Sequence, residues 1–257
     1  MSLPNNEDSP SGSSVPPFDG YENHKQIDET VSQYLRRLPP MGTYGDFFWI
    51  WIDNPHPSAE MARHAKSQKF MSQAQKLFYA YRKRRSAVED SNPNILLGTV
   101  TRKLTPDREK LKESIIKLAI AKGMTSGKWM LFPQADDVPR AWKLICEAVV
   151  EDRLGPSAKI GTEGLKGRRN QRLICVYTRD FSDQEDVRRV AEELASMNLA
   201  PRDGSKGLYY KPDAFTHLNL NSDNAYKLTT SIYCTGDILK SSKPKLEKSG
   251  LRKKLWS

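Results

Sequence analysis

Phosphate binding is the first chemistry that a short motif in this sequence suggests. Residues 123–128 read Gly-Met-Thr-Ser-Gly-Lys, which looks like half of a nucleotide-binding P-loop. A P-loop needs four residues between its glycines, a Ser or Thr after its lysine, and a strand before it with a helix after it. Here three residues separate Gly123 from Gly127, Trp129 follows the lysine, and the expected elements come in the reverse order. We therefore expect a helix end, a turn and the start of a strand, with Lys128 as the one side chain suited to meet a phosphate.

Cysteine and histidine spacing gives no sign of metal or nucleophilic chemistry. Cys146, Cys175 and Cys234 are too far apart in sequence for a zinc knuckle, and the four histidines are scattered. An odd number of cysteines in a chain without a signal peptide favours reduced thiols in the cytoplasm or nucleus. Cys175 has no histidine placed to activate it as a nucleophile. We expect no metal, cofactor, disulfide or catalytic residue.

The charge of the chain favours partners rich in phosphate. The formal net charge is +10 and the isoelectric point is near 9.4, which biases the protein toward RNA or nucleotides. The loop around Lys166, Arg168 and Arg169 is the best candidate contact, because arginine presents a planar fork of donors to phosphate. A merely solvated loop is the alternative. No apolar run approaches the roughly 18 residues of a membrane span, so we expect no membrane partner.

Composition divides the chain into one domain and two tails. Residues 1–22 are rich in Pro, Ser, Asn and Asp, and we expect a disordered acidic tail. Residues 23–240 have the composition of a single domain, and residues 241–257 form a basic tail. The first residues lack the basic and apolar regions of a signal peptide.

Hydrophobic periodicity predicts strands grouped around several helices, which is an α+β pattern with an antiparallel sheet. We expect helices over 24–38, 58–85, 105–123 and 136–155, and one beginning at Ser182 with a capping box to Glu185. Thr105 is the expected cap of the helix over 105–123. Strands are expected over 46–53, 95–104, 128–133, 157–160, 172–178, 207–213, 214–220 and 227–234. Because residues 46–53 are apolar on both faces, we expect them to form a central strand covered at least partly on both sides.

The helix expected over 58–85 is unusually basic. Lys66, Lys69, Lys76 and Lys83 fall on one line at steps of three and seven, and no acid occurs between Arg63 and Arg85. A solvated face and an interaction surface both fit this pattern.

Several strings in one order resemble a known family. GKWML, AWKLICEAVVEDRL, SAKI and RLICVYTRDFSD resemble the second half of the fold of the mRNA cap-binding translation initiation factor 4E. SGKW, the AW...AVVEDRL helix, ICVYT.DF.D and YKPD...T.L are closer still to the basophilic-leukemia-expressed protein (Bles) family, which is built on that fold. The resemblance runs from about Ile115 to Leu220. It implies a curved antiparallel sheet with three to four helices on its convex face.

The same resemblance suggests phosphate-binding residues but no standard cap site. In the cap-binding factor two tryptophans sandwich a methylated guanine and basic side chains hold the phosphates. Lys128 matches an arginine of that set, Arg172 matches a lysine, and Lys159 lies near the remaining arginine. The two sandwiching tryptophans have no counterpart here, since Trp49 and Trp51 match tryptophans of the core.

We therefore predict a non-enzymatic RNA- or nucleotide-binding protein without standard cap recognition. The predicted phosphate contacts are Lys128, Lys159, Lys166, Arg168, Arg169, Arg172 and Lys211. The alternative is a protein-interaction adaptor that receives a partner on the helical back of the fold. The two hypotheses differ in where exposed aromatic and apolar side chains should lie.

Overall fold

The computed structural model describes residues 20–42, 44–45, 47–56, 67–91, 97–164, 171–201 and 207–240. Our predictions for the two tails fall almost wholly outside this part of the chain. The loop residues Lys166, Arg168 and Arg169 also lie outside it.

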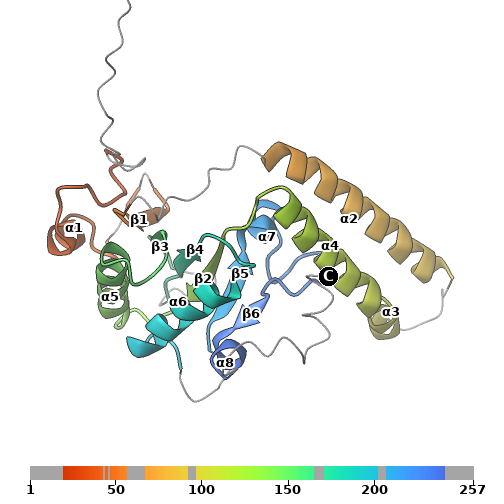
Figure 1. The fold of residues 1–257 in the computed structure, drawn as a ribbon. Coiled ribbons are helices and arrows are strands. Elements are labelled where there is room, and N and C mark those ends of the chain that lie inside the picture. The colour runs from red at the N-terminus through yellow and green to blue at the C-terminus, as the bar shows by residue number, and fades with distance from the viewer. Residues whose placement is uncertain are drawn as a thin grey trace, which may run out of the picture.

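A six-stranded antiparallel sheet forms the centre of the protein, as the α+β prediction requires (Figure 1). Its strands are β1 (Trp49–Asp53), β2 (Gly127–Leu131), β3 (Ser157–Gly161), β4 (Ile174–Thr178), β5 (Tyr209–Pro212) and β6 (Tyr233–Cys234). The spatial order is β1-β3-β4-β2-β5-β6, and the sheet is open. The predicted hairpin of 157–160 with 172–178 is confirmed, because β3 pairs with β4.

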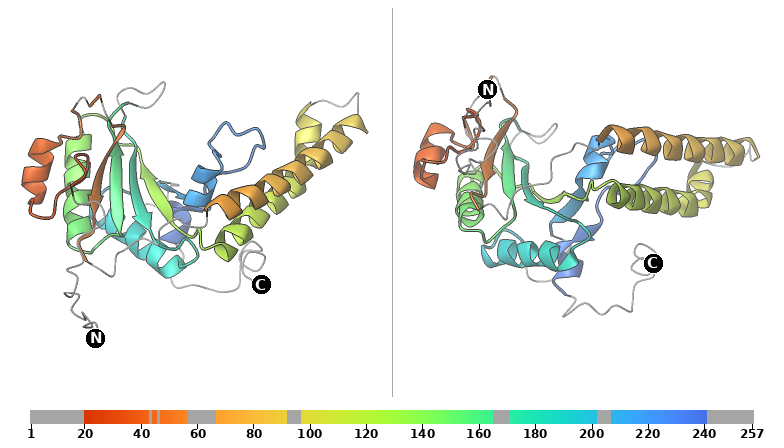
Figure 2. Two further views of the ribbon diagram at one scale, coloured as in Figure 1. Left: turned by 90° about the horizontal axis from the view of Figure 1, so that it is seen from above. Right: turned by 45° about the horizontal axis from the view of Figure 1, so that its top comes forward.

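Helices cover one face of this sheet. The helix α5 (Val138–Val150) packs on β1 and β3, and α6 (Gln184–Ser196) packs on β4. Behind them, α1 (Val31–Arg37) contacts α5, and α8 (Thr235–Ile238) contacts α6. The two views of Figure 2 show α5 and α6 on the same side of the strands. None of the helices in the described ranges has both the length and the apolarity to cross a membrane.

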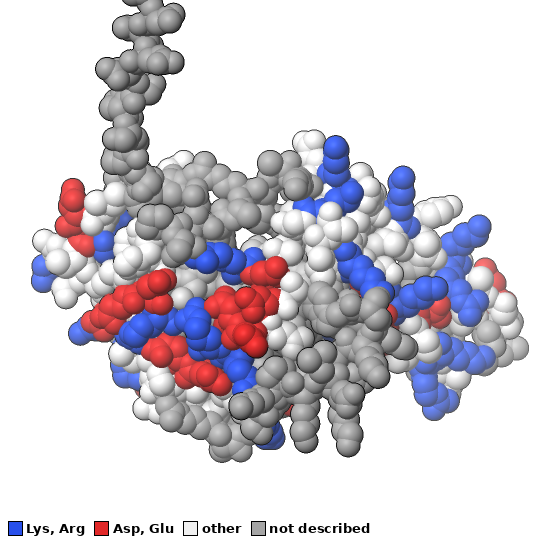
Figure 3. Space-filling model, viewed as in Figure 1, with Lys and Arg blue, Asp and Glu red and all other residues white. Residues whose placement is uncertain are grey.

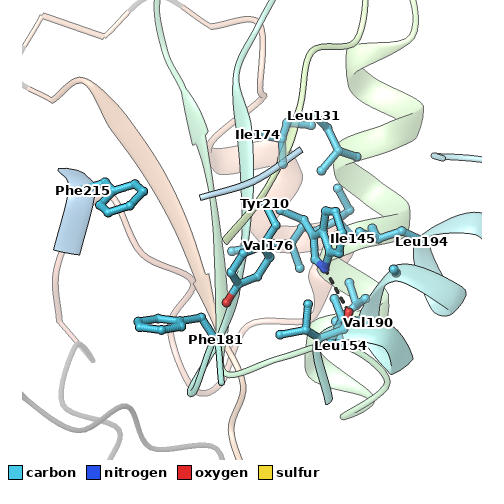
Figure 4. Packing of buried hydrophobic residues seen from close by; sticks show 14 of the residues in the cluster. Leu131, Ile145, Leu154, Ile174, Val176, Phe181, Val190, Leu194, Tyr210 and Phe215 are labelled. Atoms are coloured by element: carbon cyan, nitrogen blue, oxygen red, sulfur yellow. Dashed lines mark hydrogen bonds between the residues drawn. The ribbon is translucent and has the colours of Figure 1, made fainter. Parts of the chain in front are cut away.

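The core lies between the sheet and these two helices (Figure 4). Trp129 of β2 is fully buried, and its indole nitrogen donates a hydrogen bond to the Val187 carbonyl of α6 at 3.1 Å. Tyr210 of β5 packs edge-on against this indole and shares a buried hydrogen bond with Thr178 at 2.5 Å. Gly155 follows α5 at a point where any side chain would collide with the Tyr177 carbonyl of β4. These contacts fix β2, β4 and β5 against the helices.

Three further helices form an arm that projects from the sheet (Figure 2). The helix α2 (Ser67–Asp90) runs outward, α3 (Leu97–Lys103) lies at the far end, and α4 (Thr105–Ala121) returns beside α2. Val88, Val100 and Leu104 form a small core of their own at the far end. Nearer the sheet, Phe78 of α2 stacks on Tyr226 with ring centroids 4.3 Å apart.

The N-terminal predictions are partly wrong. The helix expected over 24–38 begins only after Thr30, whose hydroxyl and Gln33 form a capping box, so Ile27 is exposed instead of buried. β1 is shorter than predicted and lies at the edge of the sheet, not at its centre. Phe48 is 71% exposed just before it. Residues 23–25 flank this edge strand through backbone hydrogen bonds to Trp51.

Two predicted strands are helices, and two predicted caps are wrong. Within 95–104, the residues of α3 pack through Val100 on the end of α2, and this tertiary contact outweighs their β-branched composition. Residues 213–217 form the short helix α7 (Asp213–His217), not a strand. The carboxylate of Asp183, not Ser182, caps α6. Thr105 does not cap α4, because the chain turns directly from α3 into α4.

The Gly-Met-Thr-Ser-Gly-Lys segment has the structure expected from its sequence. α4 ends at Ala121, and Gly123 adopts a left-handed φ of 67° as the chain leaves the helix. β2 then begins at Gly127, so Lys128 lies inside a strand. The order of elements is helix, turn and strand, which excludes a P-loop.

Candidate functional site

The sheet face opposite α5 and α6 carries a row of lysines and aromatic rings, which we call the lysine face. Directly opposed residues of antiparallel strands share a face. Trp51 opposes Lys159, and Lys159 opposes Cys175. One row further along, Lys128 of β2 opposes both Tyr177 and Lys211. The lysine face consists of Trp49, Trp51, Lys128, Lys159, Cys175, Tyr177 and Lys211. The fold thus brings three of the seven predicted phosphate contacts together.

Lys159 lies at the centre of this face among aromatic rings. Its Nζ atom is 4.1 Å from the Trp49 ring centroid, 4.6 Å from that of Trp51 and 5.7 Å from that of Tyr177. Aromatic faces attract a cation at such distances. Within the described part of the chain, no carboxylate lies within ion-pair distance of this ammonium group. Burial lowers the pKa of Lys159, and the charge of Lys128 acts in the same direction. No carboxylate of the described chain therefore pairs directly with this charge, and Asp213 acts on it only from a longer distance.

The rings around Lys159 are themselves fixed. Trp51 stacks on His24 with centroids 5.6 Å apart and on Tyr177 with centroids 5.8 Å apart. His24 lies on the outer side of β1, whereas Tyr177 lies beyond β3, so the two contacts come from opposite sides. Nδ1 of His24 is 2.7 Å from Asp53. His24 and Tyr177 thus already stack on Trp51 from its two sides. A ligand ring could stack on Trp51 only by displacing one of them.

Lys128 is held in a buried ion pair. Its ammonium group donates to the Asp213 carboxylate at the start of α7 and to the Thr216 hydroxyl at 3.0 Å. The Ser126 hydroxyl donates to the same carboxylate at 2.8 Å. The side chains of Lys128 and Asp213 are 7% and 9% exposed. Lys128 therefore shapes the site and contributes to its potential, but its charge is balanced within the protein.

Lys211 is half-buried beside this pair. Its Nζ atom donates to the Leu220 carbonyl at 2.6 Å, which leaves other protons of the ammonium group for a ligand. Burial lowers the pKa of Lys211, and repulsion from Lys128 lowers it further. Of the three ammonium groups of the lysine face, that of Lys128 is the one with a carboxylate partner in the described part of the chain, Asp213. Phosphates placed beside Lys159 and beside Lys211, which have β4 and β2 between them, would relieve this imbalance.

Arg172 lies just before β4, outside the paired strands that define the lysine face. It lies three residues before Cys175, which corresponds to about 10 Å along a strand. It also lies two residues before Ile174, whose side chain is buried on the other face. The predicted phosphate contact of Arg172, like those of Lys166, Arg168 and Arg169, stays a prediction.

The cysteines and acids do not form a reactive cluster in the described residues. Cys175 is 1% exposed beside Lys159, and burial raises the pKa of its thiol. A buried, protonated thiol is a poor nucleophile. Within the described ranges, no three His, Cys, Asp or Glu side chains lie close enough to hold a metal ion.

Sequence reasoning missed three important residues of the site. Asp213 neutralises Lys128 from 85 positions away, Tyr177 contacts two lysine ammonium groups, and His24 stacks on Trp51. Asp213 lies in the YKPD string that resembled the family, but its counter-charge role has no local signature. These contacts depend on strand register, which the sequence alone does not define.

Comparison with known protein families agrees with the earlier resemblance. The model of one family, described as basophilic leukemia-expressed protein Bles03, matches residues 2–219. The match includes β1 to β5, and with them every residue of the lysine face. The chain belongs to the Bles03 family.

Proposed function

We propose that the protein is a non-enzymatic binding protein for RNA or a nucleotide, and that the phosphates bind at the lysine face. The observation that carries the proposal is the ammonium group of Lys159, which lies among three rings and forms no ion pair with a carboxylate of the described chain. Keeping a charge away from water is costly unless an opposite charge accompanies it. A phosphate supplies that charge at Lys159, and a further phosphate of the same ligand would meet Lys211, which has β4 and β2 between it and Lys159.

The surrounding rings suit a nucleotide better than a bare anion. Trp49 lies at the edge of the sheet and is half-buried, and Tyr209 is 39% exposed near the other end of the same face. Aromatic rings beside cations offer a stacking surface for a base next to a phosphate site. A base on either ring would leave its phosphates near the lysines in the middle of the face.

The same geometry supports our expectation that this is not a standard cap site. A methylated guanine carries a positive charge and binds between two aromatic faces by cation-π attraction. Here the ammonium group of Lys159 already lies over Trp49 and Trp51, and His24 stacks on Trp51. A cationic base would meet a like charge at this position.

The adaptor alternative has less support from the described surface. The exposed large hydrophobic side chains are Tyr21, Ile27, Met41, Phe48, Tyr79, Phe132 and Tyr209. None of these belongs to α5 or α6, the helices that cover the back of the sheet. A partner helix docking there would find no exposed apolar anchor on either helix.

A calorimetric titration tests the proposal. We expect GTP to bind the full-length protein at low salt and to weaken at least about fivefold between about 0.05 M and about 0.3 M salt, because screening reduces the attraction of the ammonium groups. Inorganic triphosphate should bind more weakly than GTP, since it has no base to stack. 7-methyl-GTP should bind no more tightly than GTP, because its cationic base would meet the ammonium group of Lys159. Absence of binding at low salt, or binding insensitive to salt, would contradict the proposal.

A further inference from the structure

The solvent-facing side of α2 carries a regular line of side chains that the lysine face does not explain. Six residues recur at alternating steps of three and four, and this spacing keeps them on one side of a helix. We call them the α2 outer stripe: Lys69, Ser72, Lys76, Tyr79, Lys83 and Ser86. All six are exposed. The opposite side of α2 is buried through Phe70, Ala74, Phe78 and Tyr81.

The lysines of this stripe have no ion-pair partner among the acids that the structure describes. Lys69, Lys76 and Lys83 form no ion pair within the described chain, whereas Arg84 pairs with Asp107 and Arg85 with Glu89. Figure 3 shows lysines and arginines gathered over the arm, in contrast to the mixed charges over α6. A surface of one sign attracts a polymer of the opposite sign and raises its association rate.

An exposed aromatic ring lies in the middle of these cations. Tyr79 is 65% exposed, and it is the one large hydrophobic residue of α2 among those that the structure shows exposed. Lys76 lies one turn before it, and Arg82 and Lys83 lie one turn after it. Cations with an aromatic ring between them are the arrangement that binds single-stranded nucleic acid, because the phosphates meet the cations and a base stacks on the ring.

Other polyanionic or amphipathic partners fit this pattern less well. A nucleic-acid duplex keeps the faces of its bases stacked inside, so Tyr79 would have no partner there. A membrane requires an apolar face on the helix, and the apolar face of α2 is buried against α4 and Tyr226. An acidic protein would use the cations, but unlike a nucleic acid it does not carry a planar group at every unit of its chain to stack on the ring.

We propose that the α2 outer stripe is a second binding site, which takes single-stranded RNA with its phosphates on Lys69, Lys76 and Lys83 and one base on Tyr79. This inference rests on the proposed function for the choice of RNA as the polymer. The stripe from Lys69 to Lys83 spans about 21 Å of helix, at 1.5 Å for each residue. A single nucleotide cannot reach along it, so the site selects a chain of several nucleotides.

Binding of a fluorescein-labelled 20-residue oligouridylate, followed by anisotropy at low salt, tests the site. We expect Tyr79→Ala to weaken binding about tenfold and Tyr79→Phe to keep it, because stacking needs the ring and not the hydroxyl. Lys76→Gln with Lys83→Gln should weaken binding and reduce the slope of log K against log salt by about 1.4, at about 0.7 for each phosphate contact on a single strand. Lys143→Gln on α5 is the matched control and should change nothing.

The outcomes separate this site from the lysine face. Each Tyr79 variant should bind GTP as the unaltered protein does, because Tyr79 lies on the arm. RNA binding that depends on Tyr79 while GTP fails to bind would support the stripe and contradict the lysine face. If GTP binds and RNA binding is unchanged in Tyr79→Ala, the result would support the lysine face and contradict the α2 outer stripe. Equal affinity for duplex and single-stranded RNA, with no effect of Tyr79→Ala, would overturn the inference.

Discussion

Replacing Lys159 with methionine is expected to abolish most nucleotide binding without destabilising the fold. A hydrogen bond to a charged group contributes roughly 1.5–3 kcal/mol, so the affinity for GTP should fall about 10-fold to 100-fold. Methionine keeps an unbranched apolar stem between Trp49 and Trp51, where sulfur packs well against rings. Calorimetric titration with GTP measures the first effect and chemical denaturation the second.

The unusual part of this prediction is the absence of a stability cost. Burial lowers the pKa of Lys159 in the folded protein. In the pH range between this lowered pKa and the ordinary lysine value, the unfolded chain binds the proton and the folded chain does not, so folding stability rises with pH there. At pH 7 the half-buried ammonium group of Lys159 therefore opposes folding, and its removal should leave the free energy of unfolding unchanged or raise it.

Lys143→Met on α5 is the matched control for this substitution. Lys143 is an exposed lysine on the covered side of the sheet, 3.8 Å from Glu147. The variant should bind GTP as the unaltered protein does. If Lys159→Met and Lys143→Met bind GTP equally well, Lys159 is not part of the site.

Replacing Asp213 with asparagine is expected to cause the largest loss of stability. The change leaves the buried ammonium group of Lys128 without its counter-charge, and breaking a buried ion pair on one side costs roughly 3–5 kcal/mol. The Ser126 hydroxyl loses a charged acceptor in the same step. Denaturant unfolding followed by circular dichroism measures the change in the free energy of unfolding.

A double substitution shows whether the loss comes from the stranded charge. Lys128→Met combined with Asp213→Asn removes both charges, so this protein should be more stable than the single Asp213→Asn variant. The exposed Arg140–Asp137 pair is the control, and Asp137→Asn should cost less than about 1 kcal/mol. A double variant as unstable as Asp213→Asn alone would show that the carboxylate acts through something other than Lys128.

The parts of the fold that could be predicted are those with a strong local pattern. α4, α5 and β2 have clear apolar periodicity, and Gly123 ends α4 in the left-handed conformation that glycine permits. α3 was predicted as a strand because Thr99, Val100 and Thr101 are β-branched. In the structure Val100 of α3 packs with Val88 of α2 and with Leu104. The local pattern of residues 97–103 does not reveal this contact.

The candidate site shows the same division between local and distant information. The alternation of GKWML predicts that Lys128 and Trp129 point to opposite faces, and the structure confirms this. The neighbours of each lysine depend on how strands from four parts of the chain align. Lys128 was therefore predicted as a phosphate contact, although it is paired with Asp213, and the rings around Lys159 were assigned to the core. Charge and family resemblance indicated three lysines that the structure places on one face of the sheet, but not the state of each cation.

The most direct test is to measure the pKa of the Lys159 ammonium group by NMR, with and without bound GTP. The resonance of its labelled ε-carbon is assigned by its loss in Lys159→Met. In the free protein the pKa should lie below the ordinary lysine value because of burial. GTP should raise it, since a nearby anion stabilises the charged form, and Lys211 should respond in the same titration. A Lys159 pKa that stays unchanged when GTP is bound would contradict the claim that the lysine face binds the phosphates.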